Sequence, residues 1–245
     1  MEKNNEKQNK KRLGIVLIAL LLLLALGTTV GFTLAKYVTE GTADSGQATI
    51  AKWGVTVTVD TSGLFGTMYK SGSIATTEAG IDVKATGDGK VVAPGTSGVL
   101  KLSVAGTPEV SAQLSMTLSS IETVFLYKDG AVYAPIKWKV GGEEVTVATE
   151  SITTYSDYKQ ALLSALQTKL ASKFATQTFA AGEAISFANG DNLISWEWAL
   201  NGDDANDTIL GNLAAGSGSE SFNATTSNTT ISIGFSAKVE QVQAQ

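Results

Sequence analysis

Apolar and polar residues alternate with a period of two over much of the chain. The alternation is clearest in PEVSAQLSMTLSS (108–120), and WGVTVTVD, GVLKLSV, LISWEWAL and TISIGFSAKVEQV repeat it. Successive side chains of a β-strand point to opposite faces, so each stretch predicts a strand with one buried and one solvent-facing side. In WGVTVTVD, the predicted buried side holds Trp53, Val55, Val57 and Val59.

Glycine-bearing turns separate these strands. APGTSG (93–98), KDG (128–130) and VGGEE (140–144) have the composition of turns, and the last two are typical of hairpins. Many short alternating strands joined by such turns predict an all-β fold, an antiparallel β-sandwich.

One segment has a helical period instead. Over 156–175, large apolar side chains recur every four residues, at Tyr158, Leu162, Leu166, Leu170 and Phe174. This spacing predicts an amphipathic helix, with Ser156 or Asp157 as its cap. Its position between strands indicates an insertion whose apolar stripe packs on the sandwich. A contact surface for a neighbouring subunit is the alternative.

The first 35 residues have the layout of a secretory signal peptide. Basic residues at 10–12 precede an uncharged stretch, whose dense apolar part, 13–26, is shorter than the roughly 20 residues of a spanning helix. Small residues at Thr33 and Ala35 predict cleavage after Ala35, so the mature chain begins at Lys36. An uncleaved membrane anchor is the alternative, and in both cases the bulk of the chain is exported.

Three regions are therefore expected: a signal peptide at 1–35, an N-terminal arm at 36–50, and a β-sandwich domain with a helical insertion at 51–245. The arm has few apolar side chains and no periodicity up to residue 48, which is typical of a flexible or extended segment. Its apolar residues are Val38, Ala48 and Ile50.

Composition excludes several functions. Residues 36–245 carry 13 Lys, no Arg and 21 acidic residues, a net charge of −8, which makes a nucleic-acid partner unfavourable. The chain has no Cys and no His, so it lacks disulfides, the commonest general base and the commonest zinc ligand. We therefore expect no catalytic site and no resident cofactor, with calcium as the one open possibility.

The calcium candidates are Asp203, Asp204 and Asp207, which follow a predicted strand and offer the hard oxygen ligands that calcium prefers. Their spacing does not match an EF-hand loop. The alternative is a solvated Asp/Asn turn.

Several segments resemble the TasA/camelysin-like family of secreted fibre-forming proteins. GTTVGFTLAKYVTEGTADSGQATIAKWGVTVTVD is similar to the signal peptides cut by a SipW-type signal peptidase, followed by the family's first strand. VVAPGTSGVLKLSVAGTPEVSAQLSMTLSS is similar to its Pro-Gly turn, strand, Gly, strand unit. ISWEWALNGDDANDTILGN and ISIGFSAKVEQVQ are similar to the C-terminal half of Gram-positive members.

This resemblance implies a jelly-roll-like sandwich that is secreted and polymerises head-to-tail into fibres of a biofilm matrix or cell surface. The arm of one subunit would complete the sheet of the next, with Val38, Ala48 and Ile50 as the inserted side chains. Implied partners are the chain itself, a SipW-type signal peptidase, and other matrix or cell-wall components. Some family members carry a metalloendopeptidase label, which we do not transfer to a chain without His.

Two other functions stay open from the sequence. One is a monomeric or membrane-anchored surface binding or adhesion module. The other is a secreted hydrolase, since a Ser–Lys pair or a carboxylate pair can be assembled in many folds.

Overall fold

The computed structural model describes residues 49–69, 82–188, 193–216 and 224–243. The chain divides into two compact units, 1–50 and 51–245, and the second contains every strand and helix described below. Within the described ranges, no helix is long and apolar enough to cross a membrane.

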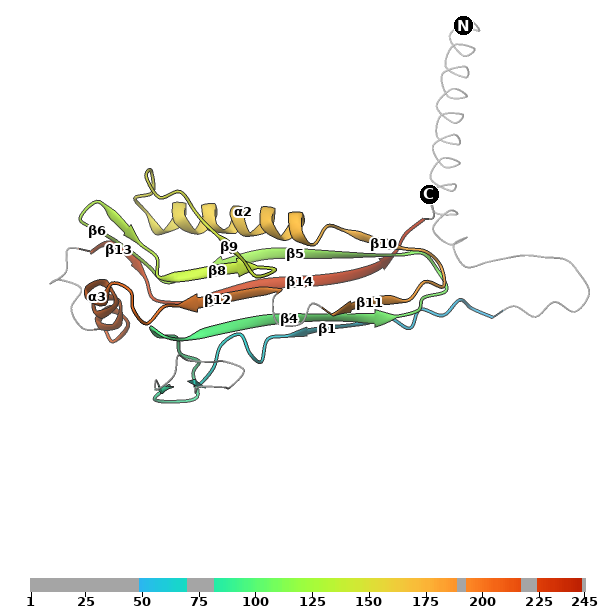
Figure 1. Cartoon of the computed structure of the whole chain (residues 1–245), viewed down its shortest axis with the longest axis horizontal. Helices are drawn as coiled ribbons and strands as arrows, with labels where there is room; N and C mark the ends of the chain where they lie inside the picture. Colours follow the sequence, from blue (N-terminus) through green and yellow to red (C-terminus); the bar gives the residue numbers. More distant parts are fainter. Residues whose placement is uncertain (1–48, 70–81, 189–192, 217–223, 244–245) are drawn as a thin grey trace, which may run out of the picture. The chain divides into compact units, whose positions relative to one another are not determined.

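The larger sheet has six strands, and all of its pairings are antiparallel (Figure 1). Its members are β1 (Thr56–Asp60), β4 (Ser97–Gly106), β12 (Ile194–Trp198), β8 (Ile136–Val140), β9 (Glu143–Val145) and β11 (Ile185–Ala188). The order is β1-β4-β12-β8-β9. β12 pairs with the first half of β4, and β11 pairs with the second half. β1 is thus an edge strand.

The second sheet has the order β10-β5-β14, with β10 (Gln177–Phe179), β5 (Ala112–Glu122) and β14 (Ser232–Gln241). β14 follows β5 along its whole length and is an edge strand of this sheet, as is β10. Two smaller sheets join β13 (Ala224–Asn228), β6 (Phe125–Lys128) and β7 (Ala131–Tyr133), and β2 (Met68–Tyr69) with β3 (Val83–Lys84).

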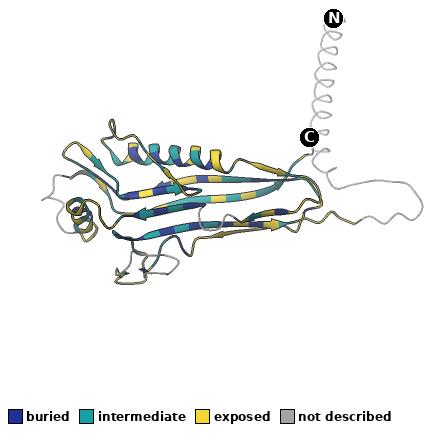
Figure 2. Cartoon of the chain, viewed as in Figure 1, coloured by how far each residue is buried: buried dark blue, intermediate teal, exposed yellow. Residues whose placement is uncertain are grey.

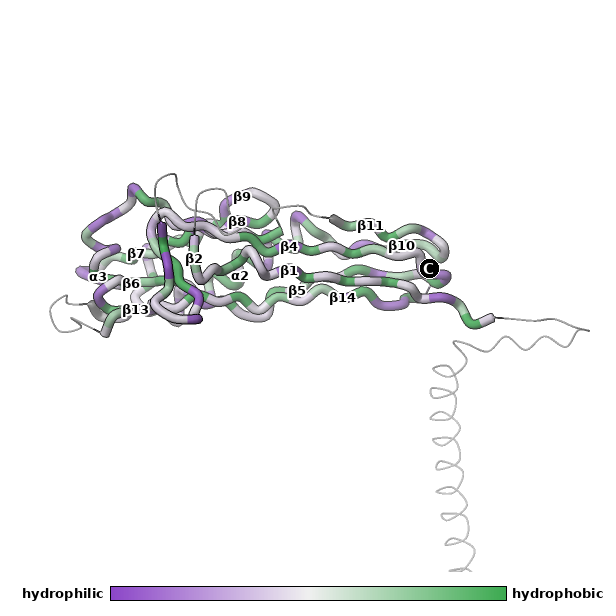
Figure 3. The backbone as a smooth tube through the Cα atoms, turned by 90° about the horizontal axis from the view of Figure 1, so that it is seen from below, coloured by the Kyte–Doolittle hydropathy of each residue, from purple (hydrophilic) through white to green (hydrophobic). Residues whose placement is uncertain are grey.

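Buried residues of both larger sheets belong to one core cluster. Figure 2 shows them in dark blue along the strands. Along β4, Leu100, Leu102 and Val104 are buried and alternate with more exposed residues, as the period-two pattern predicts. Apolar and polar segments alternate along the tube in the same way (Figure 3). The prediction of an antiparallel all-β fold with an inserted helix is confirmed.

Helix α2 (Tyr155–Lys173) confirms the predicted insertion. Its buried residues, Tyr158, Leu162, Leu166 and Leu170, are four of the five residues of the predicted stripe. The fifth, Phe174, is the C-cap and is partly buried. The N-cap is Thr154 and not the predicted Ser156 or Asp157. The Thr154 side chain accepts a hydrogen bond from the Asp157 backbone N–H. The apolar stripe therefore belongs to the core.

A second helix, α3 (Asp204–Ala214), occupies a segment that we predicted to be a loop. Asp203 caps it, and Ile209 and Leu210 are buried. The loop prediction was wrong because Asp and Asn favour turns and helix starts alike, and the apolar run that follows them is too short to show a clear period.

The prediction of a half-buried first strand was also wrong. All five residues of β1 are exposed. The reason lies in its edge position, which the alternation pattern does not reveal.

Candidate functional site

Strand β1 presents apolar side chains that face the core side but are not covered. Val57 lies opposite Val104 and Val59 opposite Leu102 in the β1–β4 register. Residues directly opposite in an antiparallel pair share one face of the sheet, and Val104 and Leu102 are buried. Val57 and Val59 therefore point inward, yet each is 37% exposed.

Strand β14 borders the same side of the molecule. It contacts β1. Phe235 lies opposite Leu118 and Val239 opposite Leu114, two fully buried residues of β5, so Phe235 and Val239 also point inward. Both are only partly buried.

We call Val57, Val59, Phe235 and Val239 the open margin. These four residues point inward from two edge strands and are incompletely covered. Strand edges also carry backbone N–H and C=O groups that can pair with a further strand. The open margin combines such edges with uncovered apolar side chains.

The segment just before β1 is held in place by specific contacts. The backbone N–H of Lys52 donates to the Glu109 carboxylate at 2.9 Å, and the backbone N–H of Glu109 donates to the Lys52 carbonyl at 2.9 Å. Gly106 lies so close to Gly54 that an added Cβ would be 2.5 Å from its carbonyl oxygen. The start of β1 is therefore held against the end of β4.

Of the predicted arm residues, Ile50 is described and is 84% exposed. Val38 and Ala48 lie outside the described residues, as do Ala35 and Lys36 of the predicted cleavage site. Insertion of these side chains and cleavage after Ala35 stay predictions.

The three predicted calcium ligands lie at the start of α3. Asp203 accepts hydrogen bonds from the backbone N–H and the side-chain amide of Asn206, at 3.1 and 2.7 Å. Asp207 Oδ1 accepts from the Tyr133 hydroxyl at 2.6 Å and from Trp198 Nε1 at 3.1 Å. These bonds fasten α3 to β7 and β12. In the described part of the chain, no three or more acidic, His or Cys side chains are grouped to hold a metal ion, and calcium binding stays a prediction.

Asp207 is the most unusual carboxyl group of this cluster. Burial raises its pKa above the ordinary value, the hydrogen bonds from Tyr133 and Trp198 lower the pKa, and the nearby Asp203 and Asp204 raise it further. Its Oδ2 atom is buried and has no hydrogen-bond partner. The hydrogen bond to Asp207 also contributes to a raised pKa of Tyr133, of which burial is the largest cause.

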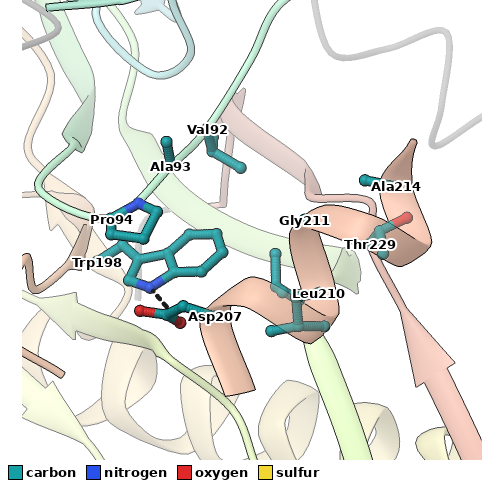
Figure 4. A pocket seen from close by; sticks show the side chains of 10 residues that line it. Val92, Ala93, Pro94, Trp198, Asp207, Leu210, Gly211, Ala214 and Thr229 are labelled. Carbon is teal, nitrogen blue, oxygen red and sulfur yellow. Dashed lines mark hydrogen bonds between the residues drawn. The ribbon is translucent and has the colours of Figure 1, made fainter. Parts of the chain in front are cut away.

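A pocket of about 140 Å³ adjoins this carboxyl group (Figure 4). Its walls are mostly apolar and come from the segment before β4, from α3 and from the end of β12. The lining residues are Val92, Ala93, Pro94, Val124, Trp198, Asp207, Leu210, Gly211, Ala214 and Thr229. Asp207 is the one titratable group among them. The space suits a small apolar group.

No family model, curated protein or solved structure matches this chain.

Sequence reasoning proposed the arm and the acidic residues as sites but did not identify the open margin. The available signal was the position of WGVTVTVD directly after the arm, since a first strand has no preceding strand to cover it. The partner of β1 in the sheet could not be derived from local pattern.

Proposed function

We propose that this protein is a secreted structural subunit that polymerises head-to-tail into extracellular fibres of a biofilm matrix or cell surface. In this proposal the arm at 36–50 of one subunit adds as a strand along β1 of the next. The resemblance to TasA/camelysin-like proteins, with their jelly-roll-like sandwich and SipW-type signal peptide, supports the proposal.

The open margin is the observation that carries it. An added strand would supply backbone partners for the edge and would cover Val57 and Val59. Each backbone hydrogen bond contributes only roughly 1 kcal/mol net, so buried side chains must supply much of the affinity. Because donor and acceptor are different parts of the chain, the contact is head-to-tail and can repeat from subunit to subunit along a filament.

Removal of the donor tests the proposal. Deleting 36–47 should leave a folded monomer that forms no filaments in negative-stain electron microscopy. The substitution Ile50→Asp should have the same effect, because it places a charge where an apolar side chain is expected to insert. Thr49→Asp is the matched control and should assemble normally, since neighbouring strand residues point to opposite faces. Normal filaments from the deleted chain would refute the arm as donor.

The pocket beside Asp207 favours a second candidate, a monomeric or membrane-anchored surface binding module. Such a module would stay monomeric in sedimentation experiments at concentrations where the fibre subunit assembles. Electron microscopy of the same samples separates the two functions, because only the first produces filaments.

A further inference from the structure

The side of the molecule opposite the open margin has a different architecture. Strand β10 pairs with β5 only over Ala112–Leu114. Beyond that point, helix α2 lies along β5 where a further strand of the sheet would continue (Figure 1). Its buried stripe enters the core at this side.

Helix α2 also contacts the polar groups of this edge. The side-chain amide of Gln167 donates to the backbone carbonyl of Leu118 at 2.9 Å. Near the end of β5, Glu122 accepts hydrogen bonds from Tyr155 and Lys159, both on α2. A residue in an antiparallel strand directs its backbone N–H and C=O to the same edge, and the residue two positions away directs its own to that edge as well. The backbone N–H and C=O groups of Leu118 and Met116 therefore both face α2.

The same helix is attached to the other sheet. Lys169 lies 2.5 Å from a carboxylate oxygen of Glu143 in β9, and Lys173 pairs with the second oxygen. One face of α2 therefore spans the distance between β5 and β9, and its ends are held by charges on both sheets.

We propose that α2 replaces an edge strand and shields β5, so that a second copy of this chain adds its strand at the open margin and not beside β5. This inference rests on the proposed function and gives the inserted helix a role in it. A subunit with one accepting side elongates, whereas a subunit with two would also associate laterally.

The test loosens α2 without changing its buried stripe. The triple variant Gln167→Ala, Lys169→Glu, Lys173→Glu removes the bond to Leu118 and reverses the charges that face Glu143. Gln160→Ala, the same change at an exposed position of the same helix, is the matched control. Adding Glu143→Lys to the triple variant restores opposite charges and should reverse part of the effect.

Two readouts decide the outcome. Amide hydrogen exchange at Leu118 and Met116 should become faster in the triple variant, because a loosened α2 gives water more access to the backbone N–H groups of this edge. A labelled peptide of residues 36–50 should bind once per wild-type chain and twice per triple-variant chain. Unchanged exchange, or one bound peptide in both proteins, would overturn the shielding role of α2.

The two proposals fail differently. If the peptide does not bind the wild-type chain, the arm is not the donor, and sedimentation velocity then decides the role of α2. In that case the triple variant must self-associate where wild type and Gln160→Ala do not. A triple variant that stays monomeric would refute the shielding role as well.

Discussion

Val57 and Val59 show how a single side chain can satisfy a local pattern and still lack cover. Both follow the alternation of a buried strand face and lie opposite buried residues of β4. Their exposure arises because β1 is an edge strand and β14 does not extend over them fully. Burial of such a side chain by a further strand lowers the free energy of the assembly.

A charge at one of these positions should prevent assembly without unfolding the subunit. Val59→Lys places an ammonium group where the added strand must pack, as lysines on natural edge strands do. Because Val59 is already 37% exposed, the free energy of unfolding should fall by no more than about 1 kcal/mol. Urea denaturation and light scattering measure the two effects. Thr58→Lys, on the other face of β1, is the control, and equal filament growth by both variants would contradict the prediction.

Asp207 should make stability depend on pH in an unusual direction. A folded-state pKa above the ordinary value of 3.8 means that the folded chain binds the proton more tightly than the unfolded chain does. The contribution to stability is then fully present below pH 3.8 and is lost as pH rises through the folded-state pKa.

Asp207→Asn should remove this contribution while keeping an oxygen that can accept from Tyr133 and Trp198. The free energy of unfolding, measured by urea denaturation from about pH 4 to 7, should fall less with pH in the variant than in the wild type. Parallel pH profiles for the two proteins would show that another group is responsible.

At the scale of elements, the pairing of β4 with β12 leaves no room for a side chain at Gly98. Trp196 lies opposite Gly98, and its Nε1 donates to the Leu64 carbonyl at 2.8 Å. A Cβ on Gly98 would lie 2.0 Å from that carbonyl oxygen and 2.6 Å from Trp196 Nε1. The glycine is needed there for space.

Gly98→Ala should therefore lower the free energy of unfolding by about 3 kcal/mol, the upper range for overpacking a core. Gly87→Ala is the control, because a Cβ at Gly87 meets no atom within 4 Å, and it should change stability by less than about 0.5 kcal/mol. Chemical denaturation measures both. A small effect at Gly98 would mean that the backbone near Leu64 can move away.

The elements also show which parts of the fold follow from sequence. α2 was predictable because its stripe runs over five turns of regular spacing, and β4 and β5 because their alternation is long. α3 was not, since its Asp-rich start matches a turn equally well. The open margin depends on which strands end up at sheet edges, and this is set by pairings between residues far apart in the chain.

At the scale of the whole molecule, assembly requires that the arm be free of the segment before it. As long as the uncharged stretch 13–35 remains attached and inserted in a membrane, the arm is tethered at its start. Cleavage after Ala35 would release an end that can enter a neighbouring subunit. In the proposed function, export, cleavage and polymerisation would be successive steps of one process.

The mature chain should therefore begin at Lys36, and N-terminal mass spectrometry of the extracellular protein tests this directly. Ala35→Leu replaces the small residue next to the predicted cut, so it should block cleavage, retain the chain at the membrane and abolish extracellular filaments. Thr28→Ala, in the same segment but away from the cut, should behave as wild type. Extracellular filaments that still contain peptides from 13–35 would show that the segment is not removed, and would favour the anchored surface module over the free fibre subunit.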